Sequence, residues 1–158
     1  MTDPILYRDA DAGDVGFILS SWLKSAGDAW ADSLRNTTIR DWSKLTDARV
    51  GWFADVPHRF TRQAVAEILD RATTRALVAC DPEDPTVIYG YAVAEPANRI
   101  AHWLHVKHSM RRNGLASELM TRVLPTWREG LTCTYAGRGF IGWMSRYPLK
   151  FNPHAGRK

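Results

Sequence analysis

The stretch that decides the fold is residues 104–116. It reads Leu104-His105-Val106-Lys107-His108-Ser109-Met110-Arg111-Arg112-Asn113-Gly114-Leu115-Ala116. An apolar, strand-like run ends near Lys107, a basic polar loop follows, and Gly114 opens an amphipathic helix. The first N–H groups of a helix have no partner within the helix and carry a partial positive charge. The arrangement therefore predicts a phosphate site.

The side chains of this loop suit an anion. Gly114 lets the backbone approach a ligand closely, and a larger side chain than that of Ala116 would obstruct the approach. Arg111 and Arg112 add charge and paired donors for phosphate oxygens. The alternative is a chance Arg-x-x-Gly-x-Ala at an ordinary helix start.

The run resembles motif A of the GCN5-related N-acetyltransferase (GNAT) superfamily, whose usual form is Leu-x-Val-x-Pro-x-Tyr-Arg-x-x-Gly-x-Gly/Ala. The residues that match in register are Leu104, Val106, Arg111, Gly114 and Ala116. His108 and Met110 stand where the family often has Pro and Tyr. A second, shorter resemblance links residues 17–25 to acetyltransferase-like proteins of tailed bacteriophages.

The family resemblance implies an acyl-CoA-dependent N-acyltransferase with acetyl-CoA, or another acyl-CoA, as co-substrate and with no metal. The strand before motif A would be splayed from its neighbour, and the pantetheine arm would pair with the backbone at Leu104, His105 and Val106. The pyrophosphate would rest on the loop at Arg111, Arg112, Asn113, Gly114, Leu115, Ala116 and Ser117. An amine would attack the thioester directly, which requires a route to deprotonate the amine.

Candidates for proton transfer lie on or beside the central strands. His102, His105 and Glu95 are candidate bases, because an unperturbed histidine titrates near physiological pH. Strict alternation along a strand places His105 on the face of Trp103 and places His102 on the other face. A structural role is the alternative for each of the three.

The family often places a Tyr near the CoA sulfur, after the fifth strand. That pattern is absent here, and Trp143 or Met144 falls near the expected position. Tyr147 and Tyr135 are the nearest phenols, so they are the candidate acids, with packing as the alternative.

The remaining sequence predicts one domain over residues 1–158. Strands are predicted at 5–8, 74–80, 87–94, 99–107, 131–135 and 149–152, and helices at 15–25, 61–72, 113–124 and 140–147. The fold class is α/β (α+β): a single mixed, mostly antiparallel sheet flanked by helices. Short helices and loops are expected at 26–60. The resemblance makes 15–72 the acceptor side, where four tryptophans form an aromatic wall or simply core: Trp22, Trp30, Trp42 and Trp52.

Charge and composition leave several partners open. Residues 1–98 hold 10 basic and 15 acidic side chains, whereas 99–158 hold 11 and 2. A polyanion is therefore expected on the second half: the phosphates of acyl-CoA, or nucleic acid. The alternatives are a nucleic-acid-binding or DNA-base-modifying phage protein and a catalytically inactive interaction protein. The acceptor amine, whether small molecule, protein or DNA base, and a homodimer stay open.

The expected setting is the cytoplasm, that of the host if the protein is phage-encoded. No apolar run approaches the roughly 20 residues that span a bilayer, so no membrane association is expected. The first residues lack the basic and apolar regions of a signal peptide. Cys80 and Cys133 both lie in strand-like apolar runs and are expected to be buried reduced thiols.

Overall fold

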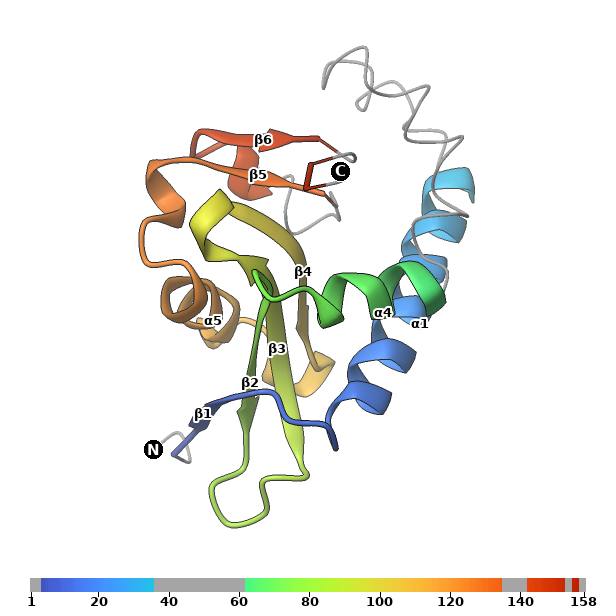
Figure 1. The fold of residues 1–158 in the computed structure, drawn as a ribbon, viewed down its shortest axis with the longest axis vertical. Helices are drawn as coiled ribbons and strands as arrows, with labels where there is room; N and C mark the ends of the chain where they lie inside the picture. Colours follow the sequence, from blue (N-terminus) through green and yellow to red (C-terminus); the bar gives the residue numbers. More distant parts are fainter. Residues whose placement is uncertain (1–3, 36–61, 135–141, 153–154, 157–158) are drawn as a thin grey trace.

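The centre of the molecule is a six-stranded sheet (Figure 1). The computed structural model describes residues 4–35, 62–134, 142–152 and 155–156, without the side chains of 26–35. The strands lie side by side in chain order: β1 (Leu6–Asp9), β2 (Arg75–Cys80), β3 (Ile88–Glu95), β4 (Ile100–Val106), β5 (Leu131–Cys133) and β6 (Leu149–Phe151). β1 to β4 pair antiparallel, while β5 pairs parallel with both β4 and β6. The predicted fold class, a mixed and mostly antiparallel sheet, is confirmed.

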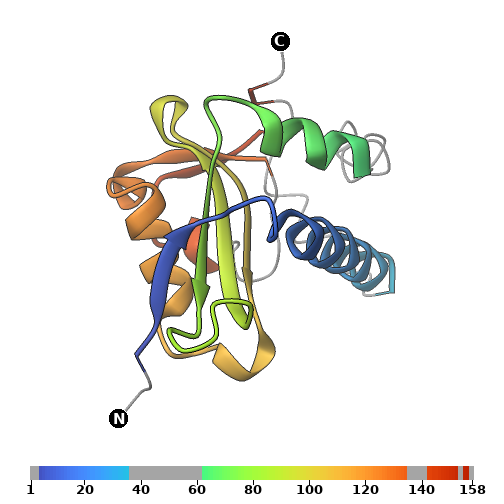
Figure 2. The ribbon, with the colours of Figure 1, turned by 60° about the horizontal axis from the view of Figure 1, so that its bottom comes forward.

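Helices cover both faces of this sheet (Figure 1 and Figure 2). α5 (Leu115–Val123) packs on one face, and α1 (Val15–Arg35) and α4 (Arg62–Asp70) pack on the other. The strands serve both layers because side chains alternate along a strand. In β3, Ala92 and Ala94 belong to the α5-side core, whereas Tyr91 and Val93 belong to the α1-side core.

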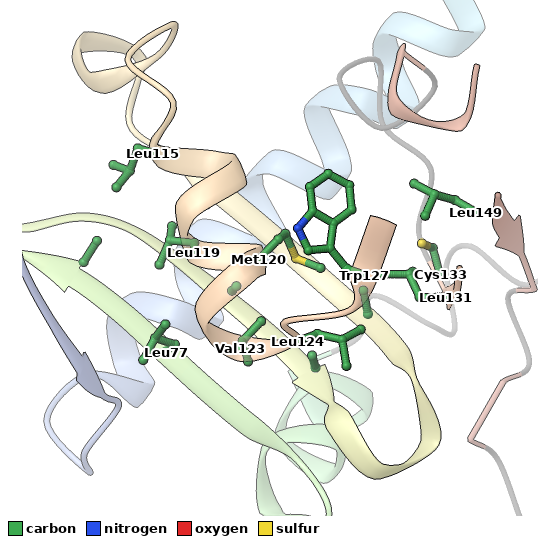
Figure 3. Close-up of a cluster of buried hydrophobic side chains, with 14 residues drawn as sticks. Leu77, Leu115, Leu119, Met120, Val123, Leu124, Trp127, Leu131, Cys133 and Leu149 are labelled. Atoms are coloured by element: carbon green, nitrogen blue, oxygen red, sulfur yellow. The ribbon is translucent and has the colours of Figure 1, made fainter. Parts of the chain in front are cut away.

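The α5-side core holds the predicted apolar stripe of the helix (Figure 3). Its buried α5 members are Leu115, Leu119, Met120 and Val123. Trp127 is fully buried beside them, and its ring centroid lies 4.5 Å from that of Trp143. The Trp127 indole donates a hydrogen bond to Thr121 Oγ1 at 3.1 Å. This packing fixes α5, and with it the start of the helix, against the sheet.

Helix α1 is longer than the sequence predicted. The predicted helix stopped at residue 25, but α1 continues to Arg35. Gly27 and Asp28 have low helix propensity and obscured the continuation. The expectation of short helices and loops is therefore wrong for 26–35, and 36–61 lie outside the described residues. None of the helices in the described ranges is both long and apolar enough to cross a membrane.

The other predicted elements lie within a few residues of the observed ones. α4 begins at Arg62 and ends at Asp70, inside the predicted 61–72. Residues 142–144 are helical within the predicted 140–147. The two cysteines are buried free thiols, as expected, and burial raises the pKa of Cys133.

Strand β4 contains one extra residue relative to β3. Trp103 lies opposite Val93 and Ala101 lies opposite Ala94, so His102 is the extra residue on β4. This is a β-bulge, which breaks the strict alternation of side chains. The bulge decides where the histidines of β4 point.

Candidate functional site

Within the described ranges, the last part of β4, residues 104–106, has a free edge on the side of β5. β4 pairs with β3 along its length, but it pairs with β5 only at Ile100 and Ala101. The Thr134 amide still donates to the Ala101 carbonyl at 3.0 Å, and the described residues that follow β5 end there. Among the described residues, no strand pairs with β4 beyond Ala101 on this side.

The backbone of Leu104 and Val106 faces this free edge. The Lys107 amide donates to the Tyr89 carbonyl of β3 at 2.8 Å, so Lys107 directs its backbone groups toward β3. Backbone groups alternate in direction along an antiparallel strand, so those of Leu104 and Val106 point away from β3. The Arg111 Nε donates to the Val106 carbonyl at 3.1 Å. This free edge thus leads directly to the basic loop.

The loop after β4 has two residues in the left-handed region. A short 3₁₀ turn, His108–Met110, is followed by Arg112 with φ 69° and Gly114 with φ 78°. A Cβ on Gly114 would meet no atom within 4 Å. The backbone angle, rather than crowding, therefore requires the glycine. Left-handed residues in such a turn aim successive N–H groups into an anion-binding concavity.

The start of α5 supplies further donors. Gly114 has no side chain to cap the helix, and the first helical bond runs from the Glu118 amide to the Gly114 carbonyl at 3.0 Å. The amides of Leu115, Ala116 and Ser117 therefore have no intrahelical acceptor. Residues 111–114 are exposed, Ala116 and Ser117 are half-buried and Leu115 is buried, so the loop that leads to these amides lies at the protein surface. A loop followed by amides without intrahelical acceptors is an arrangement that can bind an anion, and phosphate binding by this segment stays a prediction.

The charge around this loop is positive. Arg111 and Arg112 are exposed, and the nearby Lys107 Nζ lies 5.7 Å from the Phe17 ring centroid. Glu118, in the first turn of α5, is paired with Arg122 at 2.7 Å. The local field therefore favours an anion at the helix start.

His105 lies on the α1 side of the sheet. Its ring stacks on Tyr91 with 5.4 Å between centroids, and its Nδ1 lies 3.4 Å from Ser25 Oγ. Burial lowers the pKa of His105, and the positive charges of Arg111 and Lys107 lower it further. The imidazole is therefore neutral at physiological pH and able to accept a proton.

The Tyr91 ring, which stacks on His105, is itself bonded to α1. The Tyr91 hydroxyl lies 2.8 Å from Ser21 Oγ and donates to the Ile18 carbonyl of α1 at 3.2 Å. Burial raises the pKa of Tyr91, so the phenol stays protonated. Its role is therefore to join α1 to the sheet beneath the imidazole. Tyr91 could not be predicted as a site residue, since no spacing rule reveals a cross-strand neighbour before the register of β3 and β4 is known.

His102 does not take the face that strict alternation predicted. His102 Nε2 lies 2.9 Å from Glu95 Oε1, and Nδ1 lies 3.1 Å from Thr134 Oγ1. Glu95 is held in turn by Arg71, which follows α4. The β-bulge thus turns His102 toward the α4 side, and the prediction that His102 and His105 occupy opposite faces is wrong. Thr134 was not predicted as a site residue, although it lies within the strand predicted at 131–135.

Glu95 is an ionised carboxylate inside this network. Burial raises its pKa, but hydrogen bonds from Asn98, His102 and Arg71 outweigh burial and lower the pKa to about 2. Thr73 also donates to Glu95 Oε2 at 3.2 Å. A carboxylate with both oxygens bonded in this way is a poor proton acceptor.

The structure describes one of the two predicted acids, Tyr147, and places it in the α5-side layer. The Tyr147 ring packs edge-on against Trp127, with 5.0 Å between centroids, in the α5-side layer. It is thus not brought together with His105, which is on the α1 side. Trp143 and Met144 pack against the same α5-side core. Tyr135 lies outside the described residues.

Of the four tryptophans on the predicted acceptor side, the structure describes one side chain. Trp22 is buried and stacks on Trp103, with 5.2 Å between ring centroids. It is core, the default that the sequence analysis gave. Trp30 lies in α1 where side chains are not described, and Trp42 and Trp52 lie outside the described residues. No cluster of three or more His, Cys, Asp or Glu suited to a metal occurs among the described residues.

The chain is similar to solved N-acetyltransferase structures. The PaiA N-acetyltransferase from Thermoplasma acidophilum, solved with coenzyme A, aligns with a TM-score of 0.46 at 10% identity over 75% of this chain and 69% of its own. A ribosomal-protein-alanine N-acetyltransferase from Brucella melitensis aligns with a TM-score of 0.44 at 14% identity over 98% and 86%. The spermidine N-acetyltransferase from Vibrio cholerae, solved with CoA and spermine, gives 0.42 at 15% identity over 78% and 63%. No family model matches the sequence, and no curated protein matches it.

Proposed function

We propose that residues 1–158 form one acyltransferase domain of the GNAT superfamily, which transfers an acetyl or related acyl group from acyl-CoA to an amine. One observation carries the proposal: the free edge of β4 runs without interruption into the left-handed loop and the uncapped start of α5. A donor with an amide-containing arm and a pyrophosphate matches this order. The amides would pair with a strand edge, and the phosphates would accept from helix N–H groups.

In this proposal His105 is the base. The amine nitrogen attacks the thioester carbonyl carbon, the C–N bond forms, and the C–S bond breaks as the thiolate leaves. The amine must first lose a proton, which the neutral imidazole of His105 accepts directly or through a water. His102 and Glu95 suit this task less, because they are buried and bonded to each other.

No acid is assigned for the leaving thiolate. The Tyr147 ring lies in the α5-side layer, packed against Trp127. A thiolate can leave with help from solvent, so transfer does not depend on a dedicated phenol. Tyr135 stays a candidate that the sequence alone supports.

The distribution of basic side chains favours a compact donor site over an extended nucleic-acid surface. Arg99 donates to the Gly130 carbonyl at 3.0 Å and to Thr126, and Arg122 pairs with Glu118. Arg128 lies 4.4 Å from the Trp127 ring centroid. Arg99, Arg122 and Arg128 are thus engaged by groups of their own fold, while Arg111 and Arg112 lie together beside the loop.

The test is calorimetric titration of the whole chain with acetyl-CoA. Arg111→Glu should weaken binding by about 10- to 100-fold, because a hydrogen bond to a charged group contributes about 1.5–3 kcal/mol. Gly114→Val should also abolish tight binding, since a β-branched residue resists φ 78°.

Arg62→Glu is the matched control. This substitution makes the same change in net charge as Arg111→Glu. The Arg62 side chain is exposed on α4, on the other face of the sheet, so acetyl-CoA binding should be unchanged. No binding by the wild type at high micromolar acetyl-CoA would refute the donor site. Wild-type binding without thiol release across a panel of small amines, amine-bearing peptides and DNA would instead favour an inactive interaction protein.

A further inference from the structure

The end of the described β4–β5 ladder is bordered by side chains from β3, from β4 and from the residue that follows β5. The last pair of the β4–β5 ladder is Ala101 with Cys133, and the Thr134 amide still reaches the Ala101 carbonyl. The next residue on β4 is His102, the extra residue of the bulge. Without His102, Ala101 and Trp103 would be consecutive partners of Ala94 and Val93. The β3–β4 ladder would then be regular, so pairing with β3 does not require His102.

His102 instead connects the strands through its ring. Nε2 lies 2.9 Å from Glu95 Oε1 of β3, and Nδ1 lies 3.1 Å from Thr134 Oγ1 just after β5. Because Glu95 is ionised, Nε2 carries the proton and donates it to the carboxylate. Nδ1 then faces the Thr134 hydroxyl, which can both accept and donate a hydrogen bond. His102 and Glu95 are each 2% exposed and Thr134 is 8% exposed, so water does not compete for these contacts.

The Glu95 carboxylate, at one end of this series of hydrogen bonds, is held by residues outside the strands. Arg71 donates to Glu95 Oε1 at 2.8 Å, and Asn98 donates to Oε2 at the same distance. A rigid carboxylate holds the imidazole, and the imidazole holds the Thr134 hydroxyl. Thr134 is therefore held to β4 twice, by its amide and by its side chain.

We propose that His102 is a positioning residue that, with Glu95 and Thr134, sets where β5 departs from β4 and hence where the free edge for the donor's pantetheine arm begins. The inference rests on the proposed acyl-CoA site. A β5 that paired further along β4 would cover Leu104, and a looser β5 would leave the arm without its second wall. We call His102, Glu95 and Thr134 the clamp. The clamp would affect binding of the pantetheine arm and not binding at the phosphate loop, which lies at the other end of β4.

Two probes separate these parts of the site. Acetyl-CoA carries the arm and the phosphates, whereas 3′-phospho-ADP carries the phosphates without the arm. Thr134→Val removes the hydroxyl at nearly constant shape. It should weaken acetyl-CoA binding about tenfold, the effect of one lost buried hydrogen bond. Binding of 3′-phospho-ADP should stay within about twofold of wild type, and Thr134→Ser should stay within about twofold for both probes.

His102→Gln repeats the test from the other partner. The Gln amide can still reach Glu95 but not Thr134, so the same selective loss is expected even if Thr134→Val fails to fold. Equal weakening of both probes, or no weakening of either, would overturn the clamp while leaving the donor site standing. A wild-type protein that binds neither probe would overturn the donor site and the clamp together. Circular dichroism melts establish that each variant is folded.

Discussion

Replacing Glu95 by Gln should destabilise the protein in a way that depends on pH. Glu95 is almost fully buried and accepts hydrogen bonds from Arg71, Thr73, Asn98 and His102. Glu95→Gln keeps the shape but removes the charge that these donors surround. Arg71 then faces a neutral amide instead of a carboxylate at 2.8 Å.

The size of the effect follows from the pKa of this carboxyl. A pKa that falls from 4.5 to about 2 on folding contributes about 3 kcal/mol of stability near pH 7. The loss of one partner of a buried ion pair costs a similar amount, about 3–5 kcal/mol. The free energy of unfolding of the Glu95→Gln variant should therefore be about 3 kcal/mol lower than that of the wild type at pH 7.

The sign of the pH dependence follows from the lowered pKa. Above pH 4.5 the carboxyl is ionised in both states, and the contribution is complete. As the pH falls, the Glu95 carboxyl is protonated in the unfolded chain before it is protonated in the folded protein. The wild type therefore loses stability. The wild type should retain an advantage of only about 1–1.5 kcal/mol over Glu95→Gln at pH 3.

Urea unfolding followed by circular dichroism measures this difference between pH 7 and pH 3, without the screening that guanidinium chloride would add. Glu67→Gln is the control, because Glu67 is exposed on α4 and bonds only Gln63 among the described side chains. A plot of its free energy of unfolding against pH should run parallel to that of the wild type. A parallel curve for Glu95→Gln would refute the reasoning, since the carboxylate would then have the same pKa folded and unfolded.

Three further predictions concern single residues. NMR titration of His105 should give a midpoint below its ordinary 6.5, and Arg111→Gln should raise that midpoint by removing a nearby positive charge; a midpoint at or above 6.5 would contradict this. Gly90→Ala should lower the free energy of unfolding by about 1–3 kcal/mol, because its Cβ would lie 2.6 Å from the His105 carbonyl oxygen; an unchanged urea midpoint would exclude that clash. Gly16→Ala should raise thermal stability by about 0.5 kcal/mol, because a Cβ there meets no atom within 4 Å on an exposed turn of α1, and a lower melting temperature would speak against it.

The fold was largely predictable because its signals are local. The strand runs, the turn after Cys80 and the apolar stripe of α5 each depend on residues within one short window. The length of α1 was not predictable, because Gly27 and Asp28 oppose the helix locally and the structure continues through them. The order of pairing, with β5 parallel between β4 and β6, is a property of the whole chain rather than of any window.

The candidate site divides along the same line. The loop at 111–114 and the helix start after it could be located from the sequence, since the glycine and arginines are neighbours; phosphate binding there stays a prediction. The environment of the histidines could not, because a single bulge at His102 changes the face that alternation assigns. The partners that decide the chemistry of His105, Tyr91 and Ser25, come from β3 and α1, at sequence distances that no motif spans.

The half of β4 beyond the bulge serves three directions at once. The side chains of Leu104 and Val106 pack toward α5, their backbone groups face the free edge, and the ring of His105 faces α1. A donor arm on that edge would therefore lie between the layer that anchors the phosphate helix and the layer that carries the base. Movement of β4 would shift the backbone partners of the arm and the imidazole together. In the proposed site the clamp at His102 would therefore bear on catalysis as well as on binding, because fixing one end of β4 would fix the donor and the base relative to each other.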